Sequence, residues 1–452
     1  MLILLFIISL ISYLVAPDTY SFVFCVYELI LFLVSAFFFY RKMSSPTGMV
    51  NFHFFFLFSF FFVNFVYPVF LYPIDAEYFF MFSFNFDENN ISKGTALAQL
   101  AITSYMVGVN LFTRKYEEAT SFDFTKINPN FVTVLNVLFV LSTLMYLYSV
   151  ITAGDNDIVI NYQVVVIYVG LLSLKLLLKA EIYKAEFVDS TRFFLQKYWF
   201  ELISVLIVVL FSLWFGDRGP VLQIGLILLY VYTVYVKRLS AKTLTLLIVV
   251  GFVVMSFISY TRSTDSNLKD SGISGALDEG GSTFSSFVTV WDYAMDFIVN
   301  NRALYVGYEI VDENGFLYGK SYFPYFFSPV PGLPVLITQL VFDEDPEDFS
   351  TAVIISEREG VYDWGLGTNA VADGYMNFGV VGVLLMFLAF GYLIRFLELS
   401  NSFYAKFLFV SVMSYALYFP RTTLIVFAEP LRIVLFFWIL VLIFNYKVKT
   451  RE

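Results

Sequence analysis

The stretch FELISVLIVVLFSLWFGDRGPVLQIGLILLYVYTVYVKRLSAKTLTLLIVVGFVVMSFISYTR, residues 200–262, decides the fold class. It contains three apolar runs, joined first by a tight turn with Asp217 and Arg218 and then by a basic loop. A helix needs about 20 apolar residues to cross the hydrocarbon core of a bilayer. The stretch therefore predicts three consecutive membrane helices, with Arg218 and Arg262 at helix ends on the same side of the membrane.

The composition extends this prediction to the whole chain. Of its 452 residues, 59% are hydrophobic and only 14% are charged, with a mean hydropathy of +0.77. These values are typical of a polytopic membrane protein and exclude a soluble globular one. The apolar runs predict an all-α fold with about twelve membrane helices, near residues 2–16, 20–40, 51–73, 94–113, 130–151, 160–179, 198–216, 220–236, 243–261, 371–394, 403–420 and 429–446.

The distribution of charge predicts one membrane domain in three parts. Residues 1–261 would hold nine membrane helices, 262–370 a large external loop, and 371–452 the last three helices. The loop carries seventeen acidic and five basic residues, a net charge of −12. Basic residues gather instead in alternate short connections and after the last apolar run, which the positive-inside rule places in the cytoplasm. Both termini are therefore expected in the cytoplasm, and the loop in the periplasm.

Two segments of this loop are more than linker. Residues 285–310 carry apolar residues at helical spacing and predict an amphipathic helix on the membrane surface. Residues 316–342 are as apolar as a span but contain four prolines, each of which removes a helix hydrogen bond. We expect an interfacial or re-entrant segment packed against protein, since irregular backbone must be shielded from lipid.

Five arginines stand where the positive-inside rule disfavours them. A guanidinium offers donors that match phosphate or carboxylate oxygens two at a time, so arginines at the outer membrane surface suit a lipid-linked diphosphate. The alternative interpretation is structural: Arg218 lies beside Asp217 in what could be a solvated turn, and Glu429 could neutralise Arg432 across one helical turn. The candidates are Arg218, Arg262, Arg302, Arg421 and Arg432, with Glu429 between the last two.

Asp373 stands out among the external acids by its position. The segment GLGTNAVADGYMNFGVVGVLLMF, residues 365–387, puts it at the mouth of a span, where partial burial would suit it to act as a general base. A carboxylate favoured by the dipole of a helix N-terminus is the alternative. The only histidine, His53, is interpreted as a packed or interfacial residue, and the single cysteine, Cys25, excludes an intrachain disulfide.

Three motifs resemble the Wzy-type polymerases of bacterial O-antigen and related surface polysaccharides. They are GDRGPVLQ (216–223), FLYGKSYFPYFFSPVPGLP (316–334) and GTNAVADGYMNFGVVG (367–382). The first has an Arg-Gly pair after a span, the second has a Gly-x-Ser before a proline-rich stretch, and the third has Tyr-Met-Asn-Phe-Gly (375–379), similar to the family's aromatic-x-Phe-Gly opening of a late span. The chain departs from the family pattern at Gly332, where the family often has an arginine after the isoleucine-proline pair.

The resemblance implies a glycosyltransferase of the bacterial inner membrane that moves a growing glycan from undecaprenyl diphosphate onto the next lipid-linked repeat unit. Arg218 and Arg262 would hold the diphosphate and Asp373 would deprotonate the acceptor hydroxyl, as catalytic residues. Arg302, Tyr322, Arg421, Glu429 and Arg432 would bind substrate. Membrane lipid and a chain-length regulator protein are the expected partners. The sequence has no nucleotide-binding glycine-rich loop, and we expect no cofactor, no metal and no nucleic acid.

Two alternatives remain open at the level of the sequence. An O-antigen ligase has a similar layout, but the ligases place a histidine in the large loop and this loop has none. A flippase or other polysaccharide transporter would also have about twelve spans, with charges near the bilayer midplane. Here the spans are nearly free of charge and the polar residues gather outside.

Overall fold

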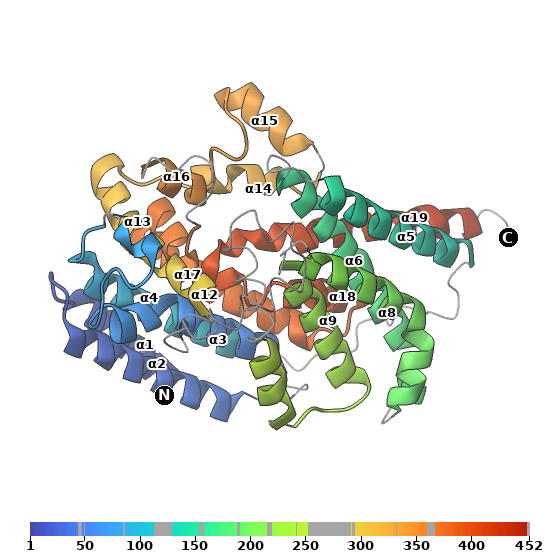
Figure 1. The fold of residues 1–452 in the computed structure, drawn as a ribbon, viewed down its shortest axis with the longest axis horizontal. Helices are drawn as coiled ribbons and strands as arrows, with labels where there is room; N and C mark the ends of the chain where they lie inside the picture. Colours follow the sequence, from blue (N-terminus) through green and yellow to red (C-terminus); the bar gives the residue numbers. More distant parts are fainter. Residues whose placement is uncertain are drawn as a thin grey trace, which may run out of the picture. The chain divides into compact units, whose positions relative to one another are not determined.

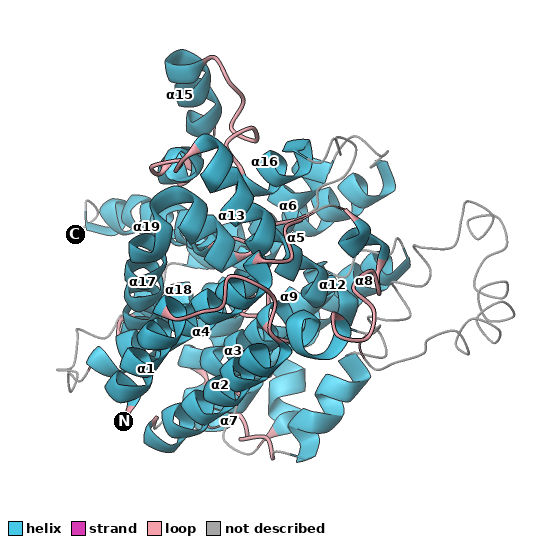
Figure 2. Ribbon diagram, turned by 90° about the vertical axis from the view of Figure 1, so that its left-hand side faces the viewer, coloured by secondary structure: helices cyan, strands magenta, loops and turns pink. Residues whose placement is uncertain are grey.

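The computed structural model describes residues 1–43, 48, 50–84, 86–112, 129–152, 158–187, 190–214, 219–240, 242–251, 291, 294–330, 332–358 and 367–449. These ranges form helices and connections, and no strand occurs in them (Figures 1 and 2). The longer helices are α1 (Leu2–Leu14), α2 (Phe22–Lys42), α3 (Phe52–Asn64), α4 (Asn90–Leu111), α5 (Pro129–Thr152), α6 (Ile158–Ile182), α8 (Thr191–Trp214), α9 (Gly219–Tyr235), α13 (Arg302–Asn314), α15 (Leu333–Phe342), α17 (Ala370–Leu399), α18 (Phe403–Met413) and α19 (Ala428–Lys449).

The all-α fold class is confirmed for the described residues. Five helical stretches in them are long and apolar enough to cross a membrane: Phe22–Lys42, Asn130–Thr152, Thr191–Trp214, Ala370–Leu399 and Leu424–Ile443. Shorter apolar helices account for several of the other predicted ranges. The chain is therefore that of a multi-pass membrane protein, and the number of twelve spans stays a prediction.

The chain divides into two compact units. Unit 1 comprises residues 1–45, 52–122 and 297–437, and unit 2 comprises 46–51, 123–296 and 438–452. In unit 2, α5, α6, α8 and α9 pack against one another. Lys175 and Lys179 on α6 both pair with the fully buried Glu201 of α8, at 2.9 and 2.7 Å. A carboxylate buried inside a membrane protein requires such pairing.

Unit 1 is built around the contact between α4 and α17, the most extensive between two of its helices. Glycines allow the two backbones to meet. A Cβ atom added at Gly108 would lie 2.1 Å from the Leu388 carbonyl oxygen, and one added at Gly391 would lie 2.2 Å from the Tyr105 carbonyl oxygen. Ser104 also donates a hydrogen bond across the contact to the Leu384 carbonyl, at 2.8 Å. Small residues and polar side chains are how membrane helices associate without a hydrophobic driving force between them.

Helix α17 has a defined start and an internal break. The Asn369 side chain accepts a hydrogen bond from the Val371 N–H, which caps the first turn. At Gly379 the backbone leaves helical geometry, with φ 64° and ψ −159°. This conformation is essentially restricted to glycine. The break divides α17 into a first part of unusual polarity, which carries Asp373 and Asn377, and an apolar second part.

The two predicted segments of the external loop fold differently from each other. Of the predicted helix at 285–310, residues 285–290, 292 and 293 lie outside the described residues, while α13 overlaps its end and continues to Asn314. The apolar side of α13 is buried against α4 and α17, so this part of the segment packs on protein. Residues 316–342 form a short 3-10 turn, η6 (Lys320–Tyr322), then α14 (Phe323–Phe327) and α15. Helix α16 (Thr351–Arg358) follows.

Candidate functional site

The Asp373 carboxylate is the centre of a buried polar cluster in unit 1. It lies in the first turn of α17 and is only 1% exposed. Its Oδ2 accepts hydrogen bonds from the Tyr322 hydroxyl at 2.8 Å and the Thr423 hydroxyl at 2.5 Å. Its Oδ1 accepts one from the Thr351 hydroxyl at 2.8 Å. The three donors come from η6, from the turn before η8 (Leu424–Phe427), and from α16, so the carboxylate joins elements far apart in the chain.

The Asp373 carboxylate is stabilised by hydrogen bonds from hydroxyl groups, without an ion pair to a basic side chain among the described residues. No ion pair links it to a basic side chain in the described part of the chain, and three O–H donors take the place of water around it. Burial of an ionised group is costly unless hydrogen bonds compensate. A substrate hydroxyl that reaches Oδ2 would take the place of one of its two donors, whose oxygen would have to move aside.

Asn377 extends the cluster by one helical turn. Its Nδ2 donates to the Ser321 hydroxyl at 2.7 Å, and its Oδ1 accepts from the Gly319 N–H at 3.1 Å. The break at Gly379 explains this docking. It frees the carbonyls of Met376 and Asn377, which then accept the N–H groups of Leu317 and Tyr318, at 2.9 and 3.0 Å. The loop segment therefore completes the interrupted helix.

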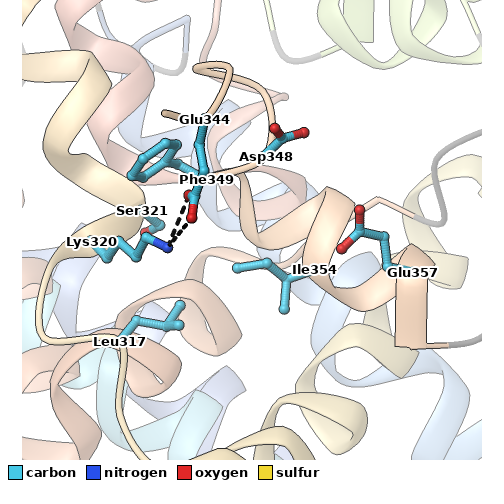
Figure 3. A pocket seen from close by; sticks show the side chains of 8 residues that line it. All are labelled: Leu317, Lys320, Ser321, Glu344, Asp348, Phe349, Ile354 and Glu357. Carbon is cyan, nitrogen blue, oxygen red and sulfur yellow. Dashed lines mark hydrogen bonds and ion pairs between the residues drawn. The ribbon is translucent and has the colours of Figure 1, made fainter. Parts of the chain in front are cut away.

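A cavity of about 340 Å³ lies beside this cluster (Figure 3). Lys320 reaches across it to Glu344, with 2.9 Å between Nζ and the nearer carboxylate oxygen. Ser321 contributes to the wall and also bonds to Asn377, and the next residue, Tyr322, donates to Asp373. The cavity and the buried carboxylate are thus connected through consecutive residues. The lining consists of Leu317, Lys320, Ser321, Glu344, Asp348, Phe349, Ile354 and Glu357.

Of the predicted site residues, the structure brings Tyr322 into direct contact with Asp373. Arg218 and Arg262 lie outside the described residues. Arg302 is buried at the start of α13, where its guanidinium carbon lies 5.5 Å from the centroid of the Phe84 ring. Its role in binding substrate stays a prediction.

The pair Glu429 and Arg432 follows the structural alternative given by the sequence. One carboxylate oxygen of Glu429 lies 2.6 Å from a guanidinium nitrogen of Arg432, across one turn of α19. Arg421 differs: its guanidinium lies over the rings of Phe297 and Tyr418, at 5.5 and 5.7 Å. It forms no ion pair or side-chain hydrogen bond with the described residues. Its role in binding substrate stays a prediction.

The Tyr325 hydroxyl is influenced by the charges of both Asp373 and Glu429. Burial raises the pKa of the Tyr325 hydroxyl above its ordinary value, and the charges of Asp373 and Glu429 raise that pKa further. The hydroxyl consequently stays protonated and able to donate. The neighbouring Tyr322 behaves alike, because burial and the Asp373 carboxylate raise its pKa well above 10. Both tyrosines are hydrogen-bond donors throughout the physiological pH range.

Sequence reasoning missed the residues that hold Asp373. Thr351, Thr423, Ser321 and Asn377 are uncharged, and two of them lie outside the motifs on which the prediction rested. Thr351 and Thr423 lie 22 and 50 positions from Asp373, so no sequence pattern links them to it. Asn377 lies one helical turn after Asp373, and this spacing is the signal that could have indicated it. Among the described residues no group of three His, Cys, Asp or Glu side chains is arranged to hold a metal ion, and metal independence stays a prediction.

Comparison with known proteins adds one finding. A family model described as O-antigen polysaccharide polymerase Wzy matches residues 1–451. A search of curated proteins and a search of solved structures found no match.

Proposed function

Because the chain belongs to the O-antigen polysaccharide polymerase Wzy family, we propose that it joins lipid-linked oligosaccharide repeat units on the outer face of the bacterial inner membrane. The growing glycan is transferred from undecaprenyl diphosphate to a hydroxyl of the next repeat unit. The bond between the anomeric carbon and the diphosphate oxygen breaks, the acceptor oxygen bonds to that carbon, and the acceptor proton passes to a base. The family match over the whole chain carries this proposal.

Arginines stabilise the diphosphate as it leaves. Arg218 and Arg262 have this role by the sequence prediction, and Arg421 is the described arginine best suited to join them. Thr423 lies two residues after Arg421 and bonds to Asp373, so the backbone that carries Arg421 borders the buried carboxylate. Donors placed where negative charge develops are typically the largest contribution to such a reaction. Arg432 is less suited, since Glu429 already neutralises it.

Asp373 accepts the proton of the acceptor hydroxyl. The acceptor takes the place of the Tyr322 hydroxyl on Oδ2, because Tyr322 directly follows a residue of the cavity wall. The carboxylate keeps the hydrogen bonds of Thr351 and Thr423 during this exchange. These two bonds hold its orientation, which is what a general base needs to meet the reacting hydroxyl at hydrogen-bonding distance.

The cavity holds a sugar of the acceptor. Carboxylates, a lysine and a hydroxyl provide acceptors and donors for sugar hydroxyls, and Phe349 provides an apolar surface. A few convergent polar groups on an apolar wall are typical of a small-molecule site. The acidic excess of the lining favours neutral or amino sugars over sugar acids.

The remaining predictions concern the setting of the enzyme. The basic residues in alternate connections support a cytoplasmic location of both termini. A chain-length regulator would contact the enzyme from the periplasmic side.

Deletion and complementation in the cells that make the glycan test this proposal. Without a polymerase, the surface carries glycan of one repeat unit, whereas without a ligase long polymer stays on the carrier lipid. Loss of a flippase leaves no glycan outside at all. We expect the deletion strain to show single repeat units, and the wild-type gene to restore the ladder of long chains. Either of the other two patterns would reject a polymerase.

A further inference from the structure

Helix α15 (Leu333–Phe342) carries an apolar surface that unit 1 leaves uncovered. It contains no charged residue, and Thr338 is its only buried residue. Its Leu336 and Leu340 side chains are 55% and 76% exposed. Figure 1 shows α15 standing out beyond α14 and α16, and Figure 2 shows it beyond α16. Helix α13 differs in this respect, because its apolar side packs against protein.

The uncovered surface continues onto a membrane-spanning helix. Past its break, α17 exposes Val381 and Leu385 by 65% and 62%, as expected of side chains that face lipid. Phe378, at the same end of that surface, packs against Tyr322 with 6.0 Å between ring centroids. Tyr322 leads directly into α14, whose Phe326 is 69% exposed and which packs on α15. Exposed apolar side chains therefore occur on the second part of α17, on α14 and on α15, and α14 packs on α15.

The charge that follows α15 limits its depth. The helix ends at Asp343, and residues 343–348 contain five carboxylates. Such a segment stays in water because moving charges into hydrocarbon is expensive. An apolar helix of ten residues that ends in an acidic turn is too short to span a bilayer and fits the interface between lipid and water.

We propose that α15 lies in the membrane interface, with Val335, Leu336, Leu340 and Val341 among lipid chains and the acidic turn in water. The occupant of the apolar surface is the bilayer itself. This arrangement places Glu344 and Asp348, which line the cavity, at the membrane surface. If the proposed function holds, the sugars of a carrier-linked repeat unit would enter the cavity while the carrier stays in the membrane.

The single cysteine of the chain makes this position measurable. Cys25 is fully buried, with its sulfur 3.9 Å from the Thr95 hydroxyl oxygen, so serine is a conservative replacement. In a full-length Cys25→Ser background, nitroxide labels would be attached at Leu336→Cys or Leu340→Cys. Glu347→Cys, in the acidic turn, is the matched control. The labelled proteins would be reconstituted in vesicles of phosphatidylethanolamine and phosphatidylglycerol.

Collision of each label with oxygen and with a water-soluble nickel complex gives its location. We expect the labels at 336 and 340 to collide more often with oxygen, and the label at 347 to collide more often with the nickel complex. Dominance of the nickel complex at all three positions would place α15 in water and overturn the proposal. Immobile labels shielded from both reagents would show that protein, such as a second copy of the chain, covers the surface, and would overturn it equally. The measurement does not depend on polymerase activity.

Discussion

Replacing Asp373 with asparagine separates a catalytic carboxylate from a merely structural one. Asparagine keeps the shape of the side chain, and the hydroxyls around it can rotate to donate or accept. A hydrogen bond to a charged group contributes about 1.5–3 kcal/mol and a neutral one about 0.5–1.5. Three such contacts would therefore weaken by about 3–4 kcal/mol in total. Loss of the buried charge removes a desolvation cost of several kcal/mol, which offsets this weakening.

We therefore expect Asp373→Asn to leave folding nearly unchanged and to remove the general base. Loss of a general base typically slows a reaction by about 10²–10⁴-fold. The assay is the length distribution of surface glycan in a strain complemented with the variant, together with the protein level and the thermal stability of the purified protein. Asp312→Asn, the same change at an exposed residue of α13, is the matched control and should support normal chains.

Two results would refute this reasoning. Long chains from Asp373→Asn at normal protein level would remove the carboxylate from the chemistry. Aggregation of Asp373→Asn with an intact Asp312→Asn would identify Asp373 as the structural centre that holds α16, α17 and η6 together, and the catalytic assignment would fall.

Four further predictions follow from particular contacts. Tyr322→Phe should retain chain extension within about tenfold of wild type, because its hydroxyl is the one that the acceptor replaces; a loss as large as that of the asparagine variant would contradict the exchange. Arg421→Gln should give glycan of one repeat unit at unchanged protein level, and a normal ladder would remove Arg421 from diphosphate binding. Gly379→Ala should lower stability by about 1–3 kcal/mol, seen as a lower melting temperature, because alanine disfavours the positive φ. Arg358 pairs with Glu309 and Glu313 of α13 and lowers the pKa of the Glu313 carboxylate, so the contribution of the Glu313 pair to the contact of α13 with α16 is complete above the ordinary pKa of glutamate and is lost as the pH falls through the lowered value. Hydrogen exchange at residues 351–358 should accelerate over that range, and unchanged exchange would contradict this.

The sequence predicted the helices well because span length is a local property. The predicted range 371–394 falls inside α17, and 20–40 falls almost entirely inside α2. The pairing of Glu429 with Arg432, which the sequence offered as the alternative to substrate binding, is likewise local, since residues three apart share a helix face. By contrast, the apolar spacing of 285–310 predicted a helix but not what covers it. Lipid and protein present a similar apolar environment to a helix, so the spacing alone could not show that the apolar side of α13 is buried against α4 and α17.

The site was predictable only where one residue carries an unusual signal. Asp373 stood out as an acid at the mouth of a span, whereas Thr351 and Thr423 are ordinary residues 22 and 50 positions away from it. Their contribution appears only when tertiary structure brings them to one carboxylate. The same holds for Arg421, which shared its sequence signal with Arg432. The structure distinguishes the two arginines by their contacts: Arg421 lies over aromatic rings, whereas Arg432 pairs with a carboxylate.

The backbone break at Gly379 gives a physical reason for two of the motifs that resemble the family. The aromatic-x-Phe-Gly pattern places a glycine where α17 must leave helical geometry, and the break exposes two carbonyls that the Gly-x-Ser segment then satisfies. The two motifs lie about 60 residues apart, and each provides what the other lacks. An uninterrupted helix would keep those carbonyls for itself and leave residues 317–319 without their partners. Tyr322 would then lose the anchor that holds it against Asp373. The glycine therefore acts on the candidate site through the backbone, without contributing a side chain to it.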